Sequence, residues 1–432
     1  MVNPALVDPD TVRATAAEAW LRGHPILRNY RTLYAQALDD ADPRHLGGFG
    51  RFRHRSRPYT PADTDPDTGT DPVAPDNDTS RSRAWLDLRT EPWVLSVPAA
   101  DRYHVLPVHE LDGGYAGFVG SRTTGREAGD HLVAGPDWHG EPPPGIRSVI
   151  RTATRLAGVL GRTQRGGTSA EDVAELARIQ QGYRLRPLHE YAGTPEPEPA
   201  PSPVWPVWRE EVFDTVEFLS FLDFLLGFVP VRPATAALRG RLADLGVDGR
   251  GEFEPAALPI AVRAEIERGI ADGKAELARA AERAQARAAD AGTFDEPDAL
   301  PAEEVWHGGL PADSAGHRPP NAGDRDYLLR FPPDALPPAR FLWSATMYAL
   351  PDRRLVDNTL DRYAIGDGTP GLVRDPDGGL TLHLRHKRPA NADHSANWLP
   401  APDGPFAVVV RLYGPDESVL DGRWTLPPLT PR

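Results

Sequence analysis

Leu380-Thr381-Leu382-His383-Leu384-Arg385 is the stretch that decides the fold class of this 432-residue chain. Apolar and polar residues alternate along it, as in a β-strand that turns one face toward a core. Further β-like runs surround it, so a second β domain is predicted over residues 327–432. These runs cover residues 341–348, 362–365, 406–413 and 424–426.

A first set of short β-like runs lies upstream, each bounded by Gly, Pro, Asp or Asn. Such regular spacing is typical of an antiparallel sandwich or jelly roll. We predict a first β domain over residues 51–190 that ends in a helix over 171–188. Its strands are expected at residues 93–97, 103–108, 115–119, 131–134 and 157–163.

Helical periodicity marks the start and the middle of the chain. Within residues 1–50, two helices are predicted, separated at Gly23 and Pro25. Residues 191–326 are predicted to form a linker and a helical region, because a Pro-Glu-rich segment is followed by apolar and charged helical patterns. The helices are expected at 212–228, 235–245 and 259–290.

The segment 51–77 is rich in Arg, Pro, Asp and Thr, which predicts a long exposed loop. Its run Arg51-Phe52-Arg53-His54-Arg55 is compatible with an anionic ligand. A solvated loop or a contact between subunits explains the run more simply.

Composition narrows the possible functions. Without cysteine, the chain has no disulfide, thiolate nucleophile or cysteine metal site. A net charge of −14 argues against nucleic acid as a partner, and no apolar run is long enough for a membrane helix. The acidic start, with Asp8 and Asp10, favours a cytoplasmic protein or a mature chain already trimmed.

No organic cofactor is predicted. The two lysines, Lys274 and Lys387, lie outside any P-loop pattern, and neither a GxSxG elbow nor a strand-GxGxxG-helix unit occurs. The histidines lack a metal-binding spacing, so no metal ligands are assigned, although a divalent metal stays open.

Both halves of the chain carry a series of short motifs. They are 18–25 (EAWLRGHP), 77–79 (NDT), 85–88 (WLDL), 94–98 (VLSVP), 122–125 (RTTG), 161–164 (GRTQ), 341–344 (FLWS), Tyr348, 355–358 (LVDN), 362–367 (RYAIGD), 397–402 (NWLPAP) and 411–415 (RLYGP). In this order the motifs resemble a bacterial two-domain family that combines domain of unknown function 1254, N-terminal, with domain of unknown function 1214, C-terminal. The resemblance implies two jelly-roll-like β domains with helical material between or around them, and it supplies no reaction.

Four of these motifs supply the candidate site residues. Asp78 and Thr79, beside Asn77, combine a carboxylate, a hydroxyl and an amide, which suit a general base with its support or a backbone cap. An Arg-Thr pattern suits an anionic substrate group or a structural ion pair. An Asn-Trp pair suits a packed corner or a binding platform. We assign catalysis to Asp78, Thr79 and Arg122, and substrate binding to Asn77, Thr123, Thr124, Arg162, Thr163, Asn397 and Trp398.

Two functions follow from these candidates. The first is a cofactor-independent enzyme that uses acid/base chemistry in a pocket of the first β domain for hydrolysis, elimination, isomerisation or cyclisation of a small organic molecule. The alternative is a non-catalytic ligand-binding or assembly protein built on β sandwiches, which could form a homo-oligomer. Convergence of Asp78 with Arg122 and Arg162 would favour the enzyme.

Overall fold

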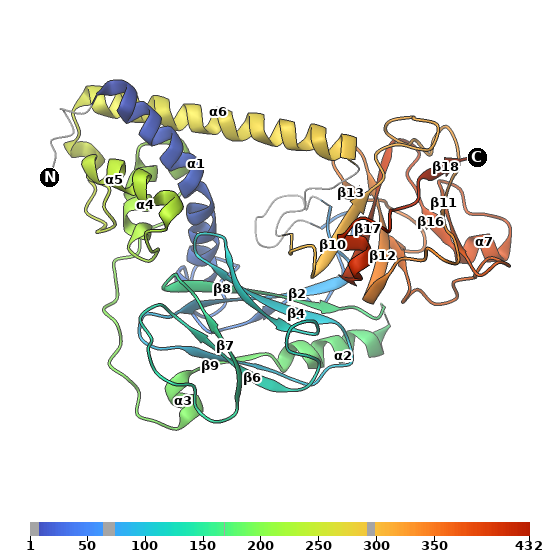
Figure 1. Cartoon of the computed structure of the whole chain (residues 1–432), viewed down its shortest axis with the longest axis horizontal. Coiled ribbons are helices and arrows are strands. Elements are labelled where there is room, and N and C mark those ends of the chain that lie inside the picture. The colour runs from blue at the N-terminus through green and yellow to red at the C-terminus, as the bar shows by residue number, and fades with distance from the viewer. Residues whose placement is uncertain (1–7, 64–73, 168, 292–298) are drawn as a thin grey trace. The chain divides into compact units, whose positions relative to one another are not determined.

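The computed structural model describes residues 8–63, 74–167, 169–291 and 299–432, and it divides into two compact units (Figure 1). Each unit is assembled from separate stretches of the chain, so neither follows a single sequence block. The first unit comprises Met1–His54, Arg81–Arg162 and Arg178–Ala281, and the second comprises Arg55–Ser80, Thr163–Ala177 and Glu282–Arg432.

A single long helix opens the first unit. α1 (Pro9–Leu33) begins at Asp8, whose carboxylate accepts a hydrogen bond from the Thr11 amide, and it continues into the π-helical turn η2 (Tyr34–Leu38). The predicted break is therefore wrong. A Cβ at Gly23 would lie 3.0 Å from Leu222 and Phe218, so this glycine admits a neighbouring helix, and the packing holds α1 together through Pro25.

The partner of α1 is α4 (Glu217–Leu226), which forms a helical core with it. Buried side chains such as Leu27, Phe218 and Ile266 fill this core, which confirms the prediction of a buried helix in 212–228. The remaining helical elements agree with the predicted middle region. They are η3 (Glu210–Asp214), η4 (Pro233–Thr235), α5 (Ala236–Asp244), η5 (Pro255–Ala257) and α6 (Ile260–Ala291).

The first β region consists of two sheets over one apolar core. Leu86, Leu106 and Val159 enter the core from one sheet, and Leu95 and Val133 enter it from the other. β1 with β2, β3 with β6 and β9, and β4 with β5 pair in antiparallel fashion, whereas β6 and β7 pair in parallel. One sheet has the order β1 (Arg53–His54), β2 (Thr79–Asp87), β8 (Leu156–Gln164), β4 (His104–Glu110), β5 (Tyr115–Gly120), and the other has the order β7 (Ile146–Arg151), β6 (Gly129–Ala134), β3 (Trp93–Val97), β9 (Arg184–Pro187).

The helix predicted at 171–188 is too long. α2 (Ala170–Gln181) stops before Gly182, and the chain then forms β9, which pairs with the edge of β3 before the short α3 (Leu188–Ala192). The sheet edge offers main-chain hydrogen bonds that outweigh the local helical pattern.

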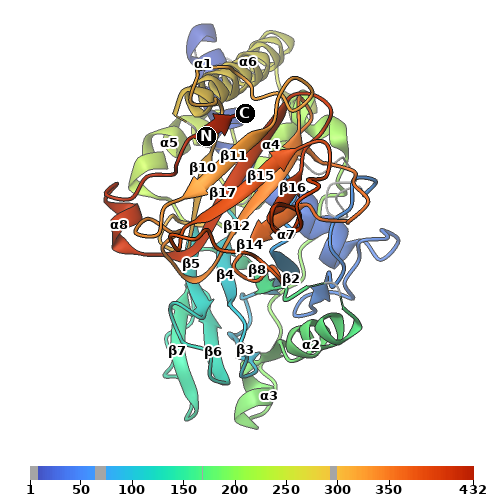
Figure 2. The same ribbon diagram turned by 90° about the vertical axis from the view of Figure 1, so that its right-hand side faces the viewer.

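The second unit also contains two sheets over one core, and its strands run diagonally across Figure 2. The deciding stretch is β15 (Leu380–Arg385), with Leu380, Leu382 and Leu384 in the core as predicted. One sheet has the order β10 (Val305–Gly309), β17 (Phe406–Pro415), β12 (Ala339–Ala349), β13 (Arg354–Leu355), with β14 (Ala364–Gly366) also on β12, and the other has the order β16 (Trp398–Pro400), β15, β11 (Tyr327–Phe331), β18 (Leu429–Pro431).

Two details of this unit differ from the sequence prediction. Residues 424–426 form no strand, because the last strand, β18, lies three residues later and pairs with β11. β10 precedes residue 327 and pairs with β17, so the β structure begins earlier than predicted. The short helices α7 (Ala392–Ala396) and α8 (Glu417–Leu420) connect strands.

The polar stretch before residue 80 belongs to this unit. We call its described parts, residues 55–63 and 74–80, the strap. Tyr59 and Ala74 of the strap are buried against Tyr348, Leu355 and Val409 of the β10-β17-β12-β13 sheet. The prediction of an exposed loop is therefore wrong for the buried residues of these parts, while Arg57, Thr60 and Ala62 are exposed. Residues 64–73 lie outside the described residues. The strap covers the face of the sheet that points away from the core.

Candidate functional site

Polar side chains gather on the outer face of the β10-β17-β12 sheet. Along β17, Val408, Val410 and Leu412 enter the core, so Arg411 and Tyr413 point to the opposite face. Pairing aligns His307 of β10, Arg411 of β17 and Ser344 of β12 in one row. Arg411 is completely buried, so its charge requires partners nearby.

Hydroxyl groups hold the Arg411 guanidinium. Its Nη1 donates to Thr346 Oγ1 at 3.1 Å, and its Nη2 donates to Tyr348 Oη at 3.0 Å. The Tyr348 hydroxyl in turn donates to the carbonyl oxygen of Pro75 in the strap. The guanidinium is thereby fixed between the sheet and the strap.

Two strap carboxylates, Asp76 and Asp78, complete the cluster. Asp76 accepts hydrogen bonds from the Thr79 hydroxyl at 2.6 Å and from the Asp78 amide at 2.7 Å. Asp78 Oδ2 accepts from Ser344 Oγ at 2.5 Å and from Tyr413 Oη at 3.0 Å. Tyr413 Oη also lies 3.3 Å from Asp76 Oδ1. We call Asp76, Asp78, Ser344, Thr346, Tyr348, Arg411 and Tyr413 the Asp78 centre.

The proton affinity of Asp78 is strongly perturbed. Burial away from water and the neighbouring negative charge of Asp76 raise its pKa from 3.8 to about 7, against the opposing effects of Arg411, Ser344 and Tyr413. Among the described residues, all hydrogen bonds to this carboxyl group reach Oδ2. Oδ1 accepts none of them, although the residue as a whole is half-buried. This carboxyl group can therefore exchange a proton near neutral pH through Oδ1.

Hydrogen bonds to main-chain groups hold the strap in place on both sides of Asp78. The side-chain amide of Asn77 accepts from the main-chain N–H of Tyr59 at 2.6 Å and donates to the Tyr59 carbonyl at 2.8 Å. On the other side, the Arg165 amide donates to the Asp78 carbonyl, and the Arg165 guanidinium donates to Ser56 O and Ser80 Oγ, both at 2.7 Å. These bonds fix the backbone from which Asp78 projects.

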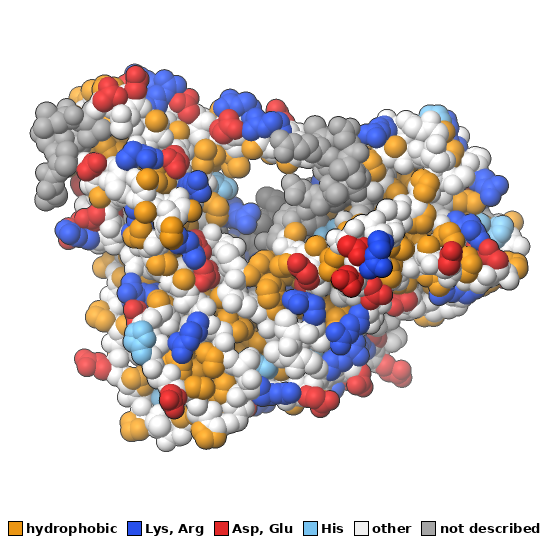
Figure 3. Space-filling model, in the orientation of Figure 1, with side chains coloured by type: hydrophobic (Ala, Val, Ile, Leu, Met, Phe, Trp, Pro, Cys, Tyr) orange, Lys and Arg blue, Asp and Glu red, His pale blue; other side chains and the backbone are white. Residues whose placement is uncertain are grey.

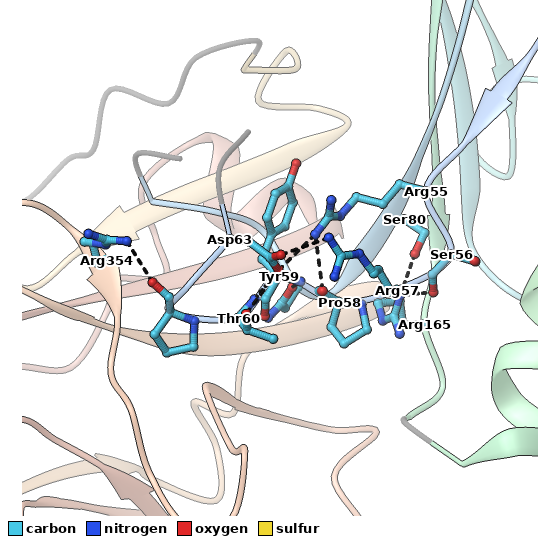
Figure 4. A network of polar contacts seen from close by, with 12 residues as sticks. Arg55, Ser56, Arg57, Pro58, Tyr59, Thr60, Asp63, Ser80, Arg165 and Arg354 are labelled. Carbon is cyan, nitrogen blue, oxygen red and sulfur yellow. Dashed lines mark hydrogen bonds and ion pairs between the residues drawn. The ribbon is translucent and has the colours of Figure 1, made fainter. Parts of the chain in front are cut away.

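A second polar network closes the strap turn (Figure 4). Asp63 accepts from the Thr60 amide at 2.8 Å and pairs with Arg55 and Arg57. Arg55 also stacks over the Tyr59 ring at 3.9 Å, and Arg354 of β13 donates to the carbonyl of Pro61. Arg55, which ends the basic run at residues 51–55 and belongs to the second unit, thus has a structural role in the strap.

Other predicted site residues lie in the first unit. Arg122 follows β5, Arg162 is buried on β8, and β4 lies between these two strands in the sheet. The Thr123 hydroxyl donates to the Phe118 carbonyl, and the Thr124 hydroxyl accepts from the Gly120 amide, so both close the turn after β5. The hydrogen-bond partners of Asp78 come instead from the second unit. Thr163 also belongs to that unit and is completely buried.

Asn397 and Trp398 form a packed corner. The Asn397 amide donates to the carbonyls of Val373 and Thr381 and accepts from the Val373 amide. The Trp398 indole donates to the Arg385 carbonyl and is buried. The polar side-chain groups of Asn397 and Trp398 thus bond to main-chain groups, and the pair stabilises the sheet that contains β15 and β16.

Sequence reasoning placed Asn77, Asp78 and Thr79 together but missed their partners. Asp76 carries no signal beyond its position beside the motif. Arg411 interrupts the apolar run of β17, and a charged residue within such a run was the one available sign of a buried ion. Ser344, Tyr348, Arg411 and Tyr413 all fall within motifs that resemble the family, whereas Thr346 does not.

Within the described ranges, no three His, Asp or Glu side chains are grouped as metal ligands. In the same ranges, no helix combines the length and apolar character needed to cross a bilayer. Basic and acidic side chains are interspersed over the face drawn in Figure 3.

Two family descriptions match separate stretches of the chain. Residues 49–187 match the family described as "Protein of unknown function (DUF1254)", and residues 310–417 match "Protein of unknown function (DUF1214)". The chain belongs to the two-domain DUF1254–DUF1214 family. The predicted resemblance is confirmed, and the first family match includes the strap and the first β region.

Among solved structures, the chain is similar to the VPA0106 protein from Vibrio parahaemolyticus, with 23% identity and a TM-score of 0.72 over 98% of this chain and 100% of that chain. This likeness shows a shared fold. A putative uncharacterized protein from Burkholderia cenocepacia is also similar, with 14% identity and a TM-score of 0.44 over 98% of this chain and 94% of that chain. No curated protein matches the chain.

Proposed function

We propose that this DUF1254–DUF1214 protein is a cofactor-independent enzyme that acts on a small organic molecule by acid/base chemistry at the Asp78 centre. The observation that carries the proposal is the carboxyl group of Asp78, whose pKa is raised to about 7 and whose Oδ1 receives no hydrogen bond from the described residues. Both of its protonation states are populated near neutral pH, as efficient proton transfer requires.

Each neighbour has a role in this chemistry. Ser344 and Tyr413 orient the carboxyl group through Oδ2, which leaves Oδ1 to take a proton from the substrate and return it. Arg411 offsets the negative charge that forms when Asp78 ionises. Thr79 and Asn77 support Asp78 indirectly, because the Thr79 hydroxyl donates to Asp76 and the Asn77 side chain binds the Tyr59 backbone.

The proposal moves the reaction centre away from the site expected at first. Asp78 keeps its catalytic role, while Arg411 takes the place assigned to Arg122. The scaffold in this proposal is a pair of jelly-roll-like β domains, of which the second carries the chemistry. Hydrolysis, elimination, isomerisation and cyclisation all suit a single proton-transferring carboxyl group.

The test is a screen of small esters, epoxides, ketones and keto acids in ²H₂O, followed by NMR. Acid/base turnover would appear as conversion or as deuterium exchange at an acidic C–H position. Asp78→Asn should slow the reaction by about 100-fold or more, because a positioned general base contributes roughly that factor.

Asp367→Asn is the matched control. Asp367 is another carboxyl group of this unit whose pKa is raised by burial, but it accepts from the main-chain amides of Trp343 and Gly368. The Asp367→Asn protein should therefore retain turnover. Equal activity of wild type and Asp78→Asn would contradict the proposal, and a compound bound without conversion would favour the ligand-binding alternative.

A further inference from the structure

The Tyr413 hydroxyl lies between two carboxylates that compete for its single proton. It is 3.0 Å from Asp78 Oδ2 and 3.3 Å from Asp76 Oδ1, and its side chain is completely buried. A phenol donates one hydrogen bond at a time. Two arrangements of the same three groups are therefore available, which differ in the carboxylate that receives the bond.

Neither arrangement leaves a carboxylate without a donor. Asp78 Oδ2 retains the Ser344 hydroxyl when Tyr413 turns away. Asp76 retains the Thr79 hydroxyl and the Asp78 amide when Tyr413 turns toward Asp78. Since an unsatisfied buried acceptor would oppose the exchange, these fixed donors make it energetically possible.

We infer that Tyr413 is a positioning residue that follows the protonation state of the centre, donating to Asp78 when Asp78 is ionised and to Asp76 when Asp78 has taken a proton. The physical reason is that a hydrogen bond to a charged acceptor is about twice as strong as one to a neutral acceptor. The inference rests on the proposed function only where it concerns a substrate.

The proton balance is simple. In the forward step, the substrate's X–H bond breaks, its proton joins Asp78 Oδ1, and the bonding electron pair stays on the substrate. The Tyr413 O–H bond remains intact and only changes its acceptor. When the product takes the proton back from Oδ1, Asp78 is ionised again and Tyr413 returns to it. No oxidant or reductant is required.

The experiment is a pH titration of the full-length protein with ¹³Cγ-labelled aspartate, for wild type and Tyr413→Phe. Losing this donor should raise the Asp78 pKa by about 1 to 2 pH units, because a hydrogen bond to a charged group is worth that much. Where a substrate is known, the pH profile of turnover should move upward by the same amount, which a purely structural role would not produce.

Tyr363→Phe is the matched control, because Tyr363 is also buried in the second unit but lies outside the Asp78 centre, and its hydroxyl donates to Asp361 Oδ1. The Asp78 pKa should stay unchanged in this variant. A folded Tyr413→Phe protein with an unchanged Asp78 pKa overturns the inference.

If Tyr413→Phe does not fold, wild type still decides the matter. The ¹³Cζ resonance of Tyr413 and the ¹³Cγ resonance of Asp76 should both shift at the midpoint of the Asp78 titration. A Tyr413 resonance that stays fixed there overturns the inference. If these shifts appear while the substrate screen finds no turnover, the proposed function fails and the hydrogen-bond exchange stands.

Discussion

Replacing Asp78 by Asn should stabilise the second unit, and increasingly so as the pH rises. The raised pKa means that the folded protein holds a proton on Asp78 that the unfolded chain loses above pH 3.8. The native state therefore binds more protons between pH 4 and 7, and stability falls as the pH rises through this window. The destabilisation that Asp78 causes is absent below pH 3.8 and reaches its full size above about pH 7.

The size of the effect follows from the two pKa values. A difference of about three pH units corresponds to about 4 kcal/mol, of which burial is the largest cause and the charge of Asp76 the next. Because Asp78 is only half-buried and its neighbours can relax, we expect about 2 to 4 kcal/mol at pH 8. Asn keeps a carbonyl oxygen for Ser344 and Tyr413 and never ionises.

Amide hydrogen exchange along β12 and β17 provides the assay. Wild type and Asp78→Asn are compared at the same pH, so that intrinsic exchange rates cancel. The increase in the free energy of unfolding caused by Asp78→Asn should be about 2 kcal/mol larger at pH 8 than at pH 5. Asp377→Asn serves as a control of opposite sign, because hydrogen bonds from Gly379 and Arg330 lower the Asp377 pKa. An Asp78→Asn protein that is less stable than wild type at pH 8 would refute the reasoning.

Three further predictions concern other parts of the molecule. Arg411→Met should cost about 3 to 5 kcal/mol in thermal unfolding, because ionised Asp78 loses the buried positive charge that favours it, and a milder effect below pH 5 than at pH 8 is expected; equal losses at both pH values would contradict this electrostatic explanation. Asn77→Ala should cost about 1 to 3 kcal/mol and admit a protease to residues 55–63, since two bonds to Tyr59 are lost; an unchanged cleavage rate would count against this role for Asn77. The first unit should lose stability as the pH falls from 6.5 toward 4, because burial lowers the pKa of His104 and lowers that of His54 and His131 to about 4, so the stability is complete above pH 6.5. Hydrogen exchange of the β4 and β6 amides measures this loss, and His131→Gln should make the stability less dependent on pH. A stability that does not change with pH would be inconsistent with neutral buried histidines.

The strands and helices were largely predictable because their signals are local. Alternation from Leu380 to Arg385 placed β15 correctly, and the apolar run at 212–228 predicted the buried α4. Local signals failed where a partner decided the outcome. Gly23 and Pro25 predicted a break, yet packing of α4 against Gly23 keeps α1 continuous, and a sheet edge turned the end of a predicted helix into β9.

The candidate site was predictable only in part. The Asn77-Asp78-Thr79 motif drew attention to the carboxylate of Asp78, and Arg122 and Arg162 were predicted beside it because their two Arg-Thr motifs lie in the same predicted domain. The cluster instead depends on contacts such as Ser344 with Asp78, across 266 positions of sequence. No spacing rule connects residues so distant.

The amino-acid sequence by itself determined the family, the alternation of the strands and the carboxylate at position 78. Tertiary structure alone decided that the polar strap lies over the outer face of the β10-β17-β12 sheet, which buries Arg411 and brings Ser344 and Tyr413 to Asp78. The physical reason is that a pKa depends on burial and neighbouring charge, and both arise only when distant segments pack together.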